Sequence, residues 1–407
     1  MKYGRFVVTA CAVLGGALVV ASLARAGEPA AIDLSLEELL SIEVTTASRK
    51  AERLQDVAGA VFVITREDIE QSGATSIPEV LRMAPGVQVA RLSQNRWAVS
   101  VRGFNGRFAN KLLVLMDGRS IYSPLFSGVI WEAEDTLLED IDRIEVVRGP
   151  GAAMWGANAV NGVINIITRR ARDTQGSLLV AGAGTEERAF AAFRHGGEAG
   201  EGHYRVWGKV FARDESVNLA GNRASDDWQA GRVGFRGDWP LASGNRLTLS
   251  AAAYNGTAGD TWDYPDLASP LGFRLQPTEQ RNQGAHVIGR REWTFDDASE
   301  ASFQAYVDHS EVDIERVVNV KRTTADLDFQ HRKLFGKTHD LIWGLGYRVS
   351  RDNTVGKALV DFSPKSRDFR LATAFAQDDI TLLPDRLRLM AGARLEHNSF
   401  TGFEFQP

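Results

Sequence analysis

The chain has 407 residues, of which 44% are hydrophobic and 24% are charged, and its formal net charge at pH 7 is -5. This length allows two or three domains with ample core, and the mildly acidic balance without a basic run excludes the electrostatic footprint of a nucleic-acid-binding protein. The 39 glycines and the 9% of aromatic residues are typical of turns and strands rather than of helical bundles.

The amino-terminal end has the organisation of a secretory signal peptide, residues 1–26. Basic residues precede an apolar run over residues 6–23, and residues 24–26 form the small-residue pattern Ala-Arg-Ala at which such peptides are cleaved. A membrane anchor is the alternative, but this pattern and the acidic segment after it favour cleavage. Cleavage would remove Cys11, the one cysteine, so no disulfide or thiolate metal site is expected.

Residues 27–56 are polar and offer little material for a core. Ser35 is placed to cap a short helix over residues 33–40, and residues 42–47 are extended in character. After the predicted signal peptide, no apolar run approaches the ~20 residues of a membrane-spanning helix. Any insertion into a membrane must therefore use β-strands.

Residues 57–172 predict a compact mixed α/β unit. Strands are expected over residues 61–64, 87–89, 99–103, 112–116, 141–147 and 162–167, with short helices after the capping residue Thr65 and over residues 77–83. Turn sequences at residues 85–86, 117–118 and 148–151 separate these elements.

From about residue 173 to the end, about eleven segments of ~10 residues alternate polar and apolar positions. The clearest segment, residues 386–396, places three leucines and two alanines on one face, and Arg388, Arg394 and Glu396 on the other. A soluble β-sandwich would show the same alternation, so periodicity alone does not decide between a sandwich and a barrel.

Two further observations favour an antiparallel transmembrane β-barrel. Trp239, Trp343 and Tyr347 lie near expected strand ends, where a barrel carries its aromatic girdle. The connections are also unequal, since residues 383–385 form a tight turn and residues 256–280 a long loop with aromatic residues. Short turns at one rim and long loops at the other are typical of outer-membrane barrels.

Six blocks of sequence resemble the TonB-dependent receptor family in order and approximate spacing. They are residues 57–69 (VAGAVFVITREDI), 78–87 (PEVLRMAPGV), 101–104 (VRGF), 113–119 (LVLMDGR), 141–156 (IDRIEVVRGPGAAMWG) and 161–169 (NGVINIITR). Residues 375–396 (FAQDDITLLPDRLRLMAGARLE) also resemble a strand pair of the barrel in this family. Any one block alone is a weak signal, whereas the six together are specific.

The resemblance implies a mixed α/β plug domain followed by an antiparallel transmembrane β-barrel of about twenty-two strands that encloses the plug. Residues 1–26 are then the signal peptide, 27–56 a periplasmic extension with the TonB box, 57–172 the plug and 173–407 a partial barrel. Only about half of the strands are expected in this chain. Because half a barrel leaves two open edges in lipid, we expect the sequence to be truncated.

The resemblance also implies that Glu43, Val44, Thr45, Thr46 and Ala47 form the TonB box. An extended, uncommitted strand can offer its backbone to the edge of a partner's sheet. The partner would be TonB, reaching across the periplasm with its inner-membrane energising complex. A plain linker strand is the alternative.

Other site residues follow from position against the family. Arg102, Glu145 and Arg148 resemble charged residues at the plug–barrel interface, although an ordinary salt bridge within the fold is the alternative. Ligand contacts are expected at the apices of the plug, from Gln94, Asn95, Arg96, Trp97, Tyr122, Phe126 and Trp131. Arginine, amide and aromatic side chains can hold an anionic or aromatic chelate, but exposed aromatics are also common without a ligand.

No catalytic or metal site is predicted, and no cofactor is expected. The seven histidines lack ligand spacing, and no Ser/His/Asp set or nucleophile elbow is present in the sequence. The Arg-Gly-Pro-Gly sequence of residues 148–151 lacks the Gly-Lys-Ser/Thr of a phosphate-binding loop. The acidic residues of the stretch 132–140 (Glu132, Glu134, Asp135, Glu139 and Asp140) are predicted to form a solvated helix face.

The sequence therefore predicts a receptor of the Gram-negative outer membrane, not an enzyme, that imports a scarce bulky solute with energy coupled through TonB. The expected ligand is a ferric chelate or a corrinoid, and no nucleic-acid partner is expected. A signalling receptor is the first alternative, but that class normally carries an extra amino-terminal domain of ~80 residues. A passive porin and a secreted soluble β-protein are the others.

Overall fold

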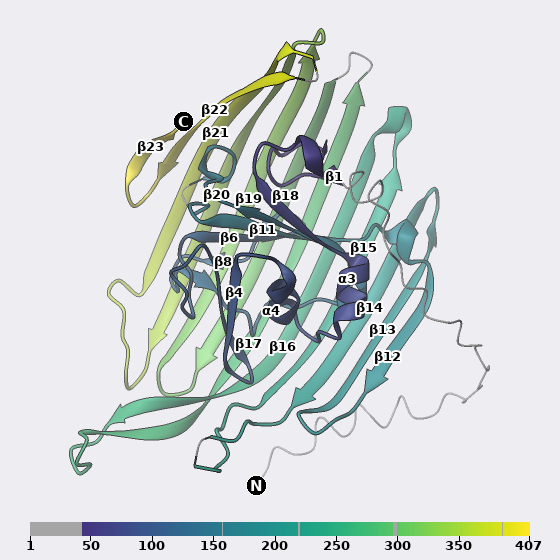
Figure 1. The fold of residues 1–407 in the computed structure, drawn as a ribbon. Coiled ribbons are helices and arrows are strands. Elements are labelled where there is room, and N and C mark those ends of the chain that lie inside the picture. The colour runs from purple at the N-terminus through teal and green to yellow at the C-terminus, as the bar shows by residue number, and fades with distance from the viewer. Residues whose placement is uncertain (1–42, 157, 219, 296–298, 385) are drawn as a thin grey trace. The chain divides into compact units, whose positions relative to one another are not determined.

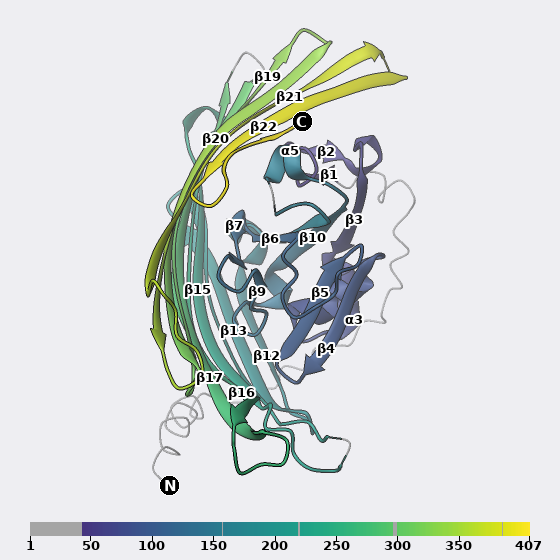
Figure 2. The same ribbon diagram turned by 90° about the vertical axis from the view of Figure 1, so that its left-hand side faces the viewer.

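The computed structural model describes residues 43–407, except residues 157, 219, 296–298 and 385. The predicted signal peptide and the helix expected over residues 33–40 lie outside this part of the chain. Within it, a compact α/β unit is followed by a large antiparallel sheet, and Figures 1 and 2 show the sheet curving around that unit. The predicted architecture of an α/β domain followed by a partial barrel is confirmed.

Five strands form the mixed sheet of the α/β unit. From edge to edge they are β3 (Ala60–Thr65), β10 (Ile141–Arg148), β11 (Gly162–Thr168), β6 (Leu112–Met116) and β7 (Arg119–Ser120). Strand β10 is antiparallel to both of its neighbours, whereas β11 and β6 are parallel. Strands β6 and β11 are buried along nearly their whole length, which explains why their sequences are apolar runs rather than alternating patterns.

Short elements complete the α/β unit. They are β1 (Glu43–Val44), β2 (Glu52–Arg53), η1 (Leu54–Asp56), α3 (Arg66–Ser72), α4 (Ile77–Val80), η2 (Leu81–Met83), β4 (Val87–Ser93), β5 (Arg96–Val101), β8 (Tyr122–Ser123), β9 (Gly128–Val129), η3 (Leu138–Asp140), α5 (Ala152–Trp155) and η4 (Ala171–Thr174). The predicted cap of α3 is present as a capping box, because the Thr65 hydroxyl accepts the Asp68 N–H and the Asp68 carboxylate accepts the Thr65 N–H. Gly73 ends this helix in the left-handed conformation that glycine adopts without strain.

The core of the unit lies between its sheet and the short helices. The largest fully buried side chains in it are Ile64, Ile77, Leu81, Trp97, Ile141, Ile144, Ile164 and Ile166. Phe211, Trp228 and Ala258 of the large sheet belong to the same cluster. This cluster anchors the α/β unit to the large sheet next to its α4–η2 and β4–β5 segments, and two smaller clusters join the two parts around Phe126 and around Met154.

Twelve antiparallel strands, each paired with the next, form the large sheet. They are β12 (Gly176–Gly182), β13 (Glu187–Ala199), β14 (Gly202–Arg213), β15 (Trp228–Pro240), β16 (Arg246–Pro265), β17 (Phe273–Phe295), β18 (Ser299–Ile314), β19 (Val318–Phe335), β20 (His339–Gly356), β21 (Ser366–Leu383), β22 (Leu387–Asn398) and β23 (Gly402–Gln406). A short turn of helix, η5 (Ala242–Gly244), joins β15 to β16. Every strand therefore has the neighbour that an up-and-down barrel wall requires.

The two faces of the large sheet are inverted relative to a soluble protein. In β22, Leu387, Leu389 and Leu395 are exposed, whereas Arg394 and Glu396 on the other face are buried against the α/β unit. The same holds across the sheet, where exposed leucines, valines and phenylalanines cover the outer face. An apolar outer face and a polar inner face are the arrangement of a wall that faces lipid outside and a lumen inside.

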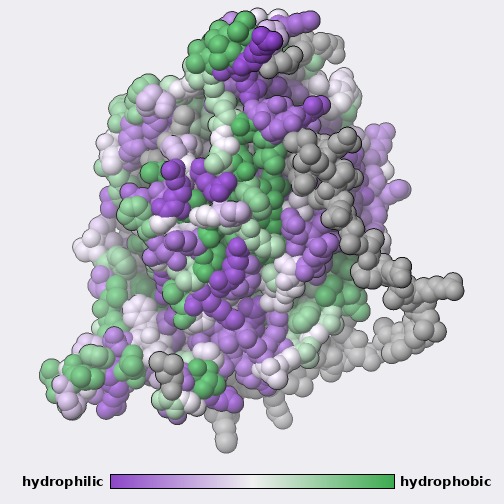
Figure 3. Space-filling view, in the orientation of Figure 1, coloured by the Kyte–Doolittle hydropathy of each residue, from purple (hydrophilic) through white to green (hydrophobic). Residues whose placement is uncertain are grey.

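The connections between strands are longer at one rim of the sheet than at the other, as predicted. The long loop predicted over residues 256–280, however, was wrong. Residues 256–280 form paired strands rather than a long loop, because β16 and β17 stay in register as far as Pro265 and Phe273. With 23 residues, β17 exceeds the ~10 residues that cross a bilayer, so this hairpin projects beyond the wall. Figure 3 shows hydrophobic side chains at its projecting tip, where Leu267 and Leu271 are exposed.

Within residues 43–407 as described, no helix is both long enough and apolar enough to cross a membrane.

We predict that Ile64→Ala lowers the free energy of unfolding of the α/β unit by about 2–5 kcal/mol, because the side chain is fully buried and its removal leaves a cavity. The measurement is the urea concentration at the midpoint of unfolding of the gene product in detergent, monitored by tryptophan fluorescence. Leu92→Ala is the matched control, since that side chain is 54% exposed, and its midpoint should hardly change. Equal shifts for both variants would contradict the core assignment.

Candidate functional site

Residues 43–53 form a small hairpin in which β1 pairs with β2, with Glu43 opposite Arg53 and Val44 opposite Glu52. We call this segment the amino-terminal hairpin. Val44 and Thr46 are buried, although most residues of this segment are polar. The predicted TonB box therefore lies docked rather than free.

A single carboxylate holds the first half of the hairpin. Glu145 of β10 is fully buried and accepts the backbone N–H groups of Thr45 (2.9 Å) and Thr46 (2.7 Å). The same carboxylate accepts a bond of 2.8 Å from Nε of Arg143. Trp155 adds a bond of 2.6 Å from its indole N–H to the Thr46 carbonyl. Two main-chain donors on one buried anion form a strong, charge-assisted contact.

The second half of the hairpin is tied to the wall by two basic residues that sequence reasoning did not single out. Arg49 contacts the Asp328 carboxylate at 3.2 Å, and its guanidinium lies 4.3 Å from the centre of the Trp155 ring. Lys50 contacts Asp340 at 2.7 Å and also Asp379. Burial alone would lower the pKa of Lys50, but the bonds to these two carboxylates outweigh it and raise the pKa above its usual value.

The opposite end of the α/β unit is anchored by the β4–β5 hairpin. Asn95 is fully buried, and its amide contacts the carbonyl oxygens of Asp226, Asp227 and Gly259 at 2.8–3.1 Å. Beside it, Arg96 forms an ion pair with Asp260 of β16. These polar groups join the tip of the hairpin to the wall.

Trp97 continues this anchor into the core. Its indole N–H donates to Glu79 at 2.6 Å, and its ring meets that of Trp228 edge to face at 5.5 Å. Burial raises the pKa of Glu79, but the bonds from Arg82 and Trp97 outweigh it and hold the pKa below the usual value. Gln94, in contrast, keeps a partly exposed side chain, and only its backbone N–H bonds to the wall, at Asp226.

The remaining predicted ligand residues differ in accessibility. Trp131 is buried within the main core cluster. Tyr122 and Phe126 are partly exposed and line a small cavity of about 60 Å³ between the α/β unit and the wall. Burial raises the pKa of Tyr122, so its hydroxyl stays a donor throughout the physiological range.

The three predicted interface charges lie apart from the wall. Glu145 sits beneath the amino-terminal hairpin, Arg148 donates to the Pro85 carbonyl at 3.1 Å, and Arg102 is exposed with a left-handed φ of 59°. Among the residues that the structure describes, none of the three forms an ion pair with the large sheet.

The acidic stretch 132–140 supplies much of the interface instead, and the prediction of a solvated helix face was wrong. Only residues 138–140 are helical, as a 3-10 turn, and Glu132, Asp135 and Asp140 are buried. Their partners come mostly from the wall, in the pairs Asp140–Arg194 (2.5 Å), Asp140–Arg205 (3.1 Å), Asp135–Lys209 (2.8 Å) and Glu132–Gln280 (3.0 Å). Glu134 binds Arg119, which in turn reaches Asp308 of β18.

A cavity of about 860 Å³ lies between the amino-terminal hairpin, the α/β sheet and the inner face of β15–β22. No group of three or more metal-ligating side chains is found in the described part of the chain.

We predict that Glu145→Gln frees the amino-terminal hairpin, because the amide cannot supply the charge that holds two backbone N–H groups. A cysteine placed by Ala47→Cys should react with a maleimide at least about 10-fold faster in this variant. Glu67→Gln, the same change on an exposed helix, is the control and should leave the rate unchanged. An unchanged rate in Glu145→Gln would rule out this carboxylate as the holding group.

We also predict that Asn95→Ala loosens the α/β unit from the wall. Loss of the amide leaves buried carbonyls unpaired and should cost about 1–3 kcal/mol. The readout is the urea concentration at which the α/β unit becomes sensitive to protease in membrane vesicles. Gln94→Ala is the neighbouring control, with no expected shift, and equal effects would refute the anchor.

Comparison with known proteins identifies both parts of the chain. Residues 53–163 match the family model described as the TonB-dependent receptor plug domain, and residues 191–407, more than half of the chain, match the TonB dependent receptor-like β-barrel model. The Vitamin B12 transporter BtuB of Vibrio vulnificus is 36% identical over 152 residues, which cover 37% of this chain and 24% of that protein. BtuB of Vibrio cholerae is 30% identical over 251 residues, which cover 57% and 40%.

Solved structures share the fold at low sequence identity. The ferripyoverdine receptor of Pseudomonas aeruginosa aligns with a TM-score of 0.70 and 15% identity, over 90% of this chain and 55% of that one. The siderophore receptor PirA of the same species aligns with a TM-score of 0.62 and 19% identity, over 85% and 57%. The chain thus spans less than half of these curated relatives and little more than half of these structures. It belongs to the TonB-dependent receptor family, whose members are outer-membrane β-barrel transporters of Gram-negative bacteria rather than enzymes.

Proposed function

We propose that this chain forms the plug and part of the barrel wall of a receptor that imports a corrinoid or a ferric chelate with energy delivered through TonB. The observation that carries the proposal is the amino-terminal hairpin, a short strand docked on Glu145 at the end of the plug where a partner could pull it. The relatives named for vitamin B12 and the structural neighbours named for ferric siderophores support the two ligand classes.

Coupling would use the backbone of Glu43, Val44, Thr45, Thr46 and Ala47. A strand of TonB can pair with this segment only after the segment leaves β2 and Glu145, since a main-chain N–H donates to one partner at a time. Glu145, Trp155 and β2 hold the segment, and a partner's strand would replace the backbone bonds among these contacts. A pull from TonB, energised by its inner-membrane complex, would then break the contacts of Arg49 and Lys50 with the wall and act on the plug through η1 and β3.

We propose the domain limits in the same terms. Residues 1–26 would be the signal peptide, 27–56 the periplasmic extension, 57–172 the plug and 173–407 the partial barrel. The helical turn η4, which separates β11 from the first strand of the large sheet, supports a boundary near residue 172.

Among the residues proposed for ligand contact, Gln94, Tyr122 and Phe126 are favoured because their side chains keep some exposure. Asn95, Arg96 and Trp97 are engaged with the wall or the core, which supports a role in holding the apex in place. Trp131 is buried in the core and supports a structural role as well. Ligand specificity would then come largely from loops of the projecting rim.

The test is transport of labelled cyanocobalamin and of a labelled ferric siderophore by cells that produce the complete gene product. Combined Val44→Pro and Ala47→Pro should abolish energised uptake, because proline removes the backbone N–H groups needed for strand pairing. Binding to de-energised cells should remain. Combined Val44→Ala and Ala47→Ser, which keep the N–H groups, are the control and should retain most uptake.

Uptake that survives the proline changes, or that continues without TonB, would overturn energy coupling and point to passive diffusion. Binding without any uptake by the unaltered protein would instead favour a signalling receptor.

A further inference from the structure

We propose that Arg170, Arg246 and Arg290 form an oxyanion-binding subsite inside the cavity between plug and wall, which the imported solute occupies on its way past the plug. The inference rests on the proposed function and narrows the cargo to solutes that carry carboxylate, catecholate or phosphate oxygens. None of the residues proposed above for ligand contact belongs to this subsite.

The cavity has the size and the boundaries of a passage. Its volume of about 860 Å³ falls within the roughly 300–1,000 Å³ of pockets that bind small molecules. Thr45, Arg49 and Lys50 of the amino-terminal hairpin form part of its lining. Removal of the hairpin by a pulling partner would therefore open the cavity on that side.

Basic side chains are numerous in the lining. Eleven arginine and lysine side chains line the cavity together with seven aspartate and glutamate side chains. Asp238, Asp340 and Asp379, which are not part of the lining, pair with Arg236, Arg332 and Lys50. An arginine of the lining that has no carboxylate of its own would attract an anion.

The pairing of arginines with carboxylates differs between two parts of the cavity. Next to β19 and β20, each arginine has its own carboxylate, in the pairs Arg348–Asp326 (2.7 Å), Arg332–Asp340 (2.8 Å) and Arg49–Asp328 (3.2 Å). Next to β16 and β17, Arg246 (3.2 Å) and Arg290 (3.3 Å) share the single carboxylate of Glu292. One of these two charges is therefore uncompensated.

Arg170 supplies a third charge from the plug side. Its guanidinium is partly buried and has no ion pair or hydrogen bond with any side chain among the residues that the structure describes. Burial lowers the pKa of Arg170, and the nearby charges of Arg246 and Arg172 lower it further, whereas Glu292 and Asp173 partly offset this. An incoming oxyanion would relieve that repulsion.

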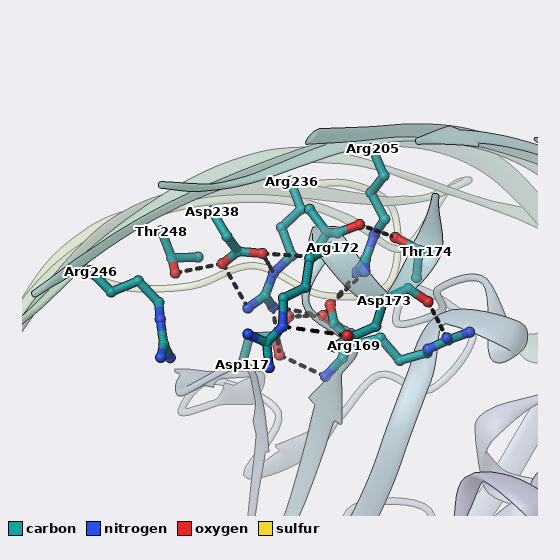
Figure 4. Close-up of polar contacts among 12 residues, drawn as sticks. Asp117, Arg169, Arg172, Asp173, Thr174, Arg205, Arg236, Asp238, Arg246 and Thr248 are labelled. Carbon is teal, nitrogen blue, oxygen red and sulfur yellow. Dashed lines mark hydrogen bonds and ion pairs between the residues drawn. The ribbon is translucent and has the colours of Figure 1, made fainter. Parts of the chain in front are cut away.

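The backbone next to Arg170 is held against the wall. Figure 4 shows Arg246, Thr248, Arg236 and Asp238 side by side on the wall, close to the segment that contains Arg169 and Arg172. That segment is clamped, because the Ala171 N–H donates to the Asp238 carboxylate at 2.7 Å. Asp238 is itself fixed by Arg236 (3.0 Å) and Thr248 (2.7 Å).

The geometry of the wall places its two arginines together. In the pairing of β16 with β17, Thr248 is opposite Arg290 and Arg246 is opposite Glu292, so the two arginines are diagonal neighbours on one face. Guanidinium groups in such a fixed arrangement bind carboxylate and phosphate oxygens through paired N–H donors. A neutral or cationic solute would find no complement here.

The first experiment uses pyrophosphate as the probe and the complete gene product, purified with its barrel closed. Calorimetric titration should detect binding that weakens about 10-fold in Arg170→Gln and in Arg290→Gln, the loss expected for one charge-assisted contact. Arg170→Lys, which keeps the charge, should recover part of the affinity. Heat-modifiable gel mobility verifies that each variant is folded.

Arg281→Gln is the matched control, because Arg281 also lies on β17, pairs with Glu279 and is exposed outside the cavity. It should bind pyrophosphate as the unaltered protein does. Absence of pyrophosphate binding, or an equal loss in the control, would overturn the subsite.

The second experiment separates a passage from a site that merely holds free phosphate. Uptake of a ferric tris-catecholate by energised cells should fall several-fold in Arg170→Gln, while its binding to de-energised cells stays the same. Unchanged uptake in a variant that has lost pyrophosphate binding would overturn the passage. If the unaltered protein imports without TonB, the proposed function fails, whereas the pyrophosphate result stands on its own.

Discussion

The plug is held inside the curved wall mainly by charges that are buried in pairs. Asp140 with Arg194 and Arg205, Asp135 with Lys209, and Lys50 with Asp340 each cross the boundary between the two parts. Such pairs add little net stability, because the cost of removing both ions from water offsets their attraction, yet leaving one partner alone is costly. The ion pairs therefore fix the position of the plug while adding little to the free energy that holds it against the wall. Apolar packing crosses the boundary around Trp97 and Trp228, around Phe126 and Val312, and around Met154 and Ile342.

The charged boundary would allow the plug both to stay in place and to separate from the wall. An interface of paired charges and small cavities can open to solvent with a modest loss, because water solvates each ion as it separates. A continuous apolar interface would resist that separation. The charged side chains at this boundary make the inner face of β15–β20 polar. That polar face forms one side of the proposed arginine-lined passage beside the plug.

Local signals in the sequence predicted much of this fold. The Thr65 cap, the helix over residues 77–83 and the buried strands β6 and β11 follow from caps, periodicity and apolar runs. The acidic stretch 132–140 was misread because its partners lie on strands 50 or more residues later, which no local pattern reveals. The β16–β17 hairpin was misread as a loop because polar and aromatic residues there suit strands that extend beyond the lipid. For Arg49 and Lys50, the available signal was a pair of adjacent basic residues that follows the predicted TonB box.

The position of β3 at the edge of the plug sheet has a mechanical consequence. The amino-terminal hairpin leads through η1 directly into β3, whose one neighbour in that sheet is β10. A pull on the hairpin would therefore peel β3 away from β10 bond by bond, since the strand lies at the rim of the sheet and not between two others. The twelve residues from 54 to 65, once straightened, span roughly 40 Å. Meanwhile the clamp of Ala171 on Asp238 keeps the other end of the plug attached to the wall. Residues 54–65 could therefore be pulled out of the plug as an extended segment, while the other strands of the plug sheet stay paired and its far end stays attached to the wall.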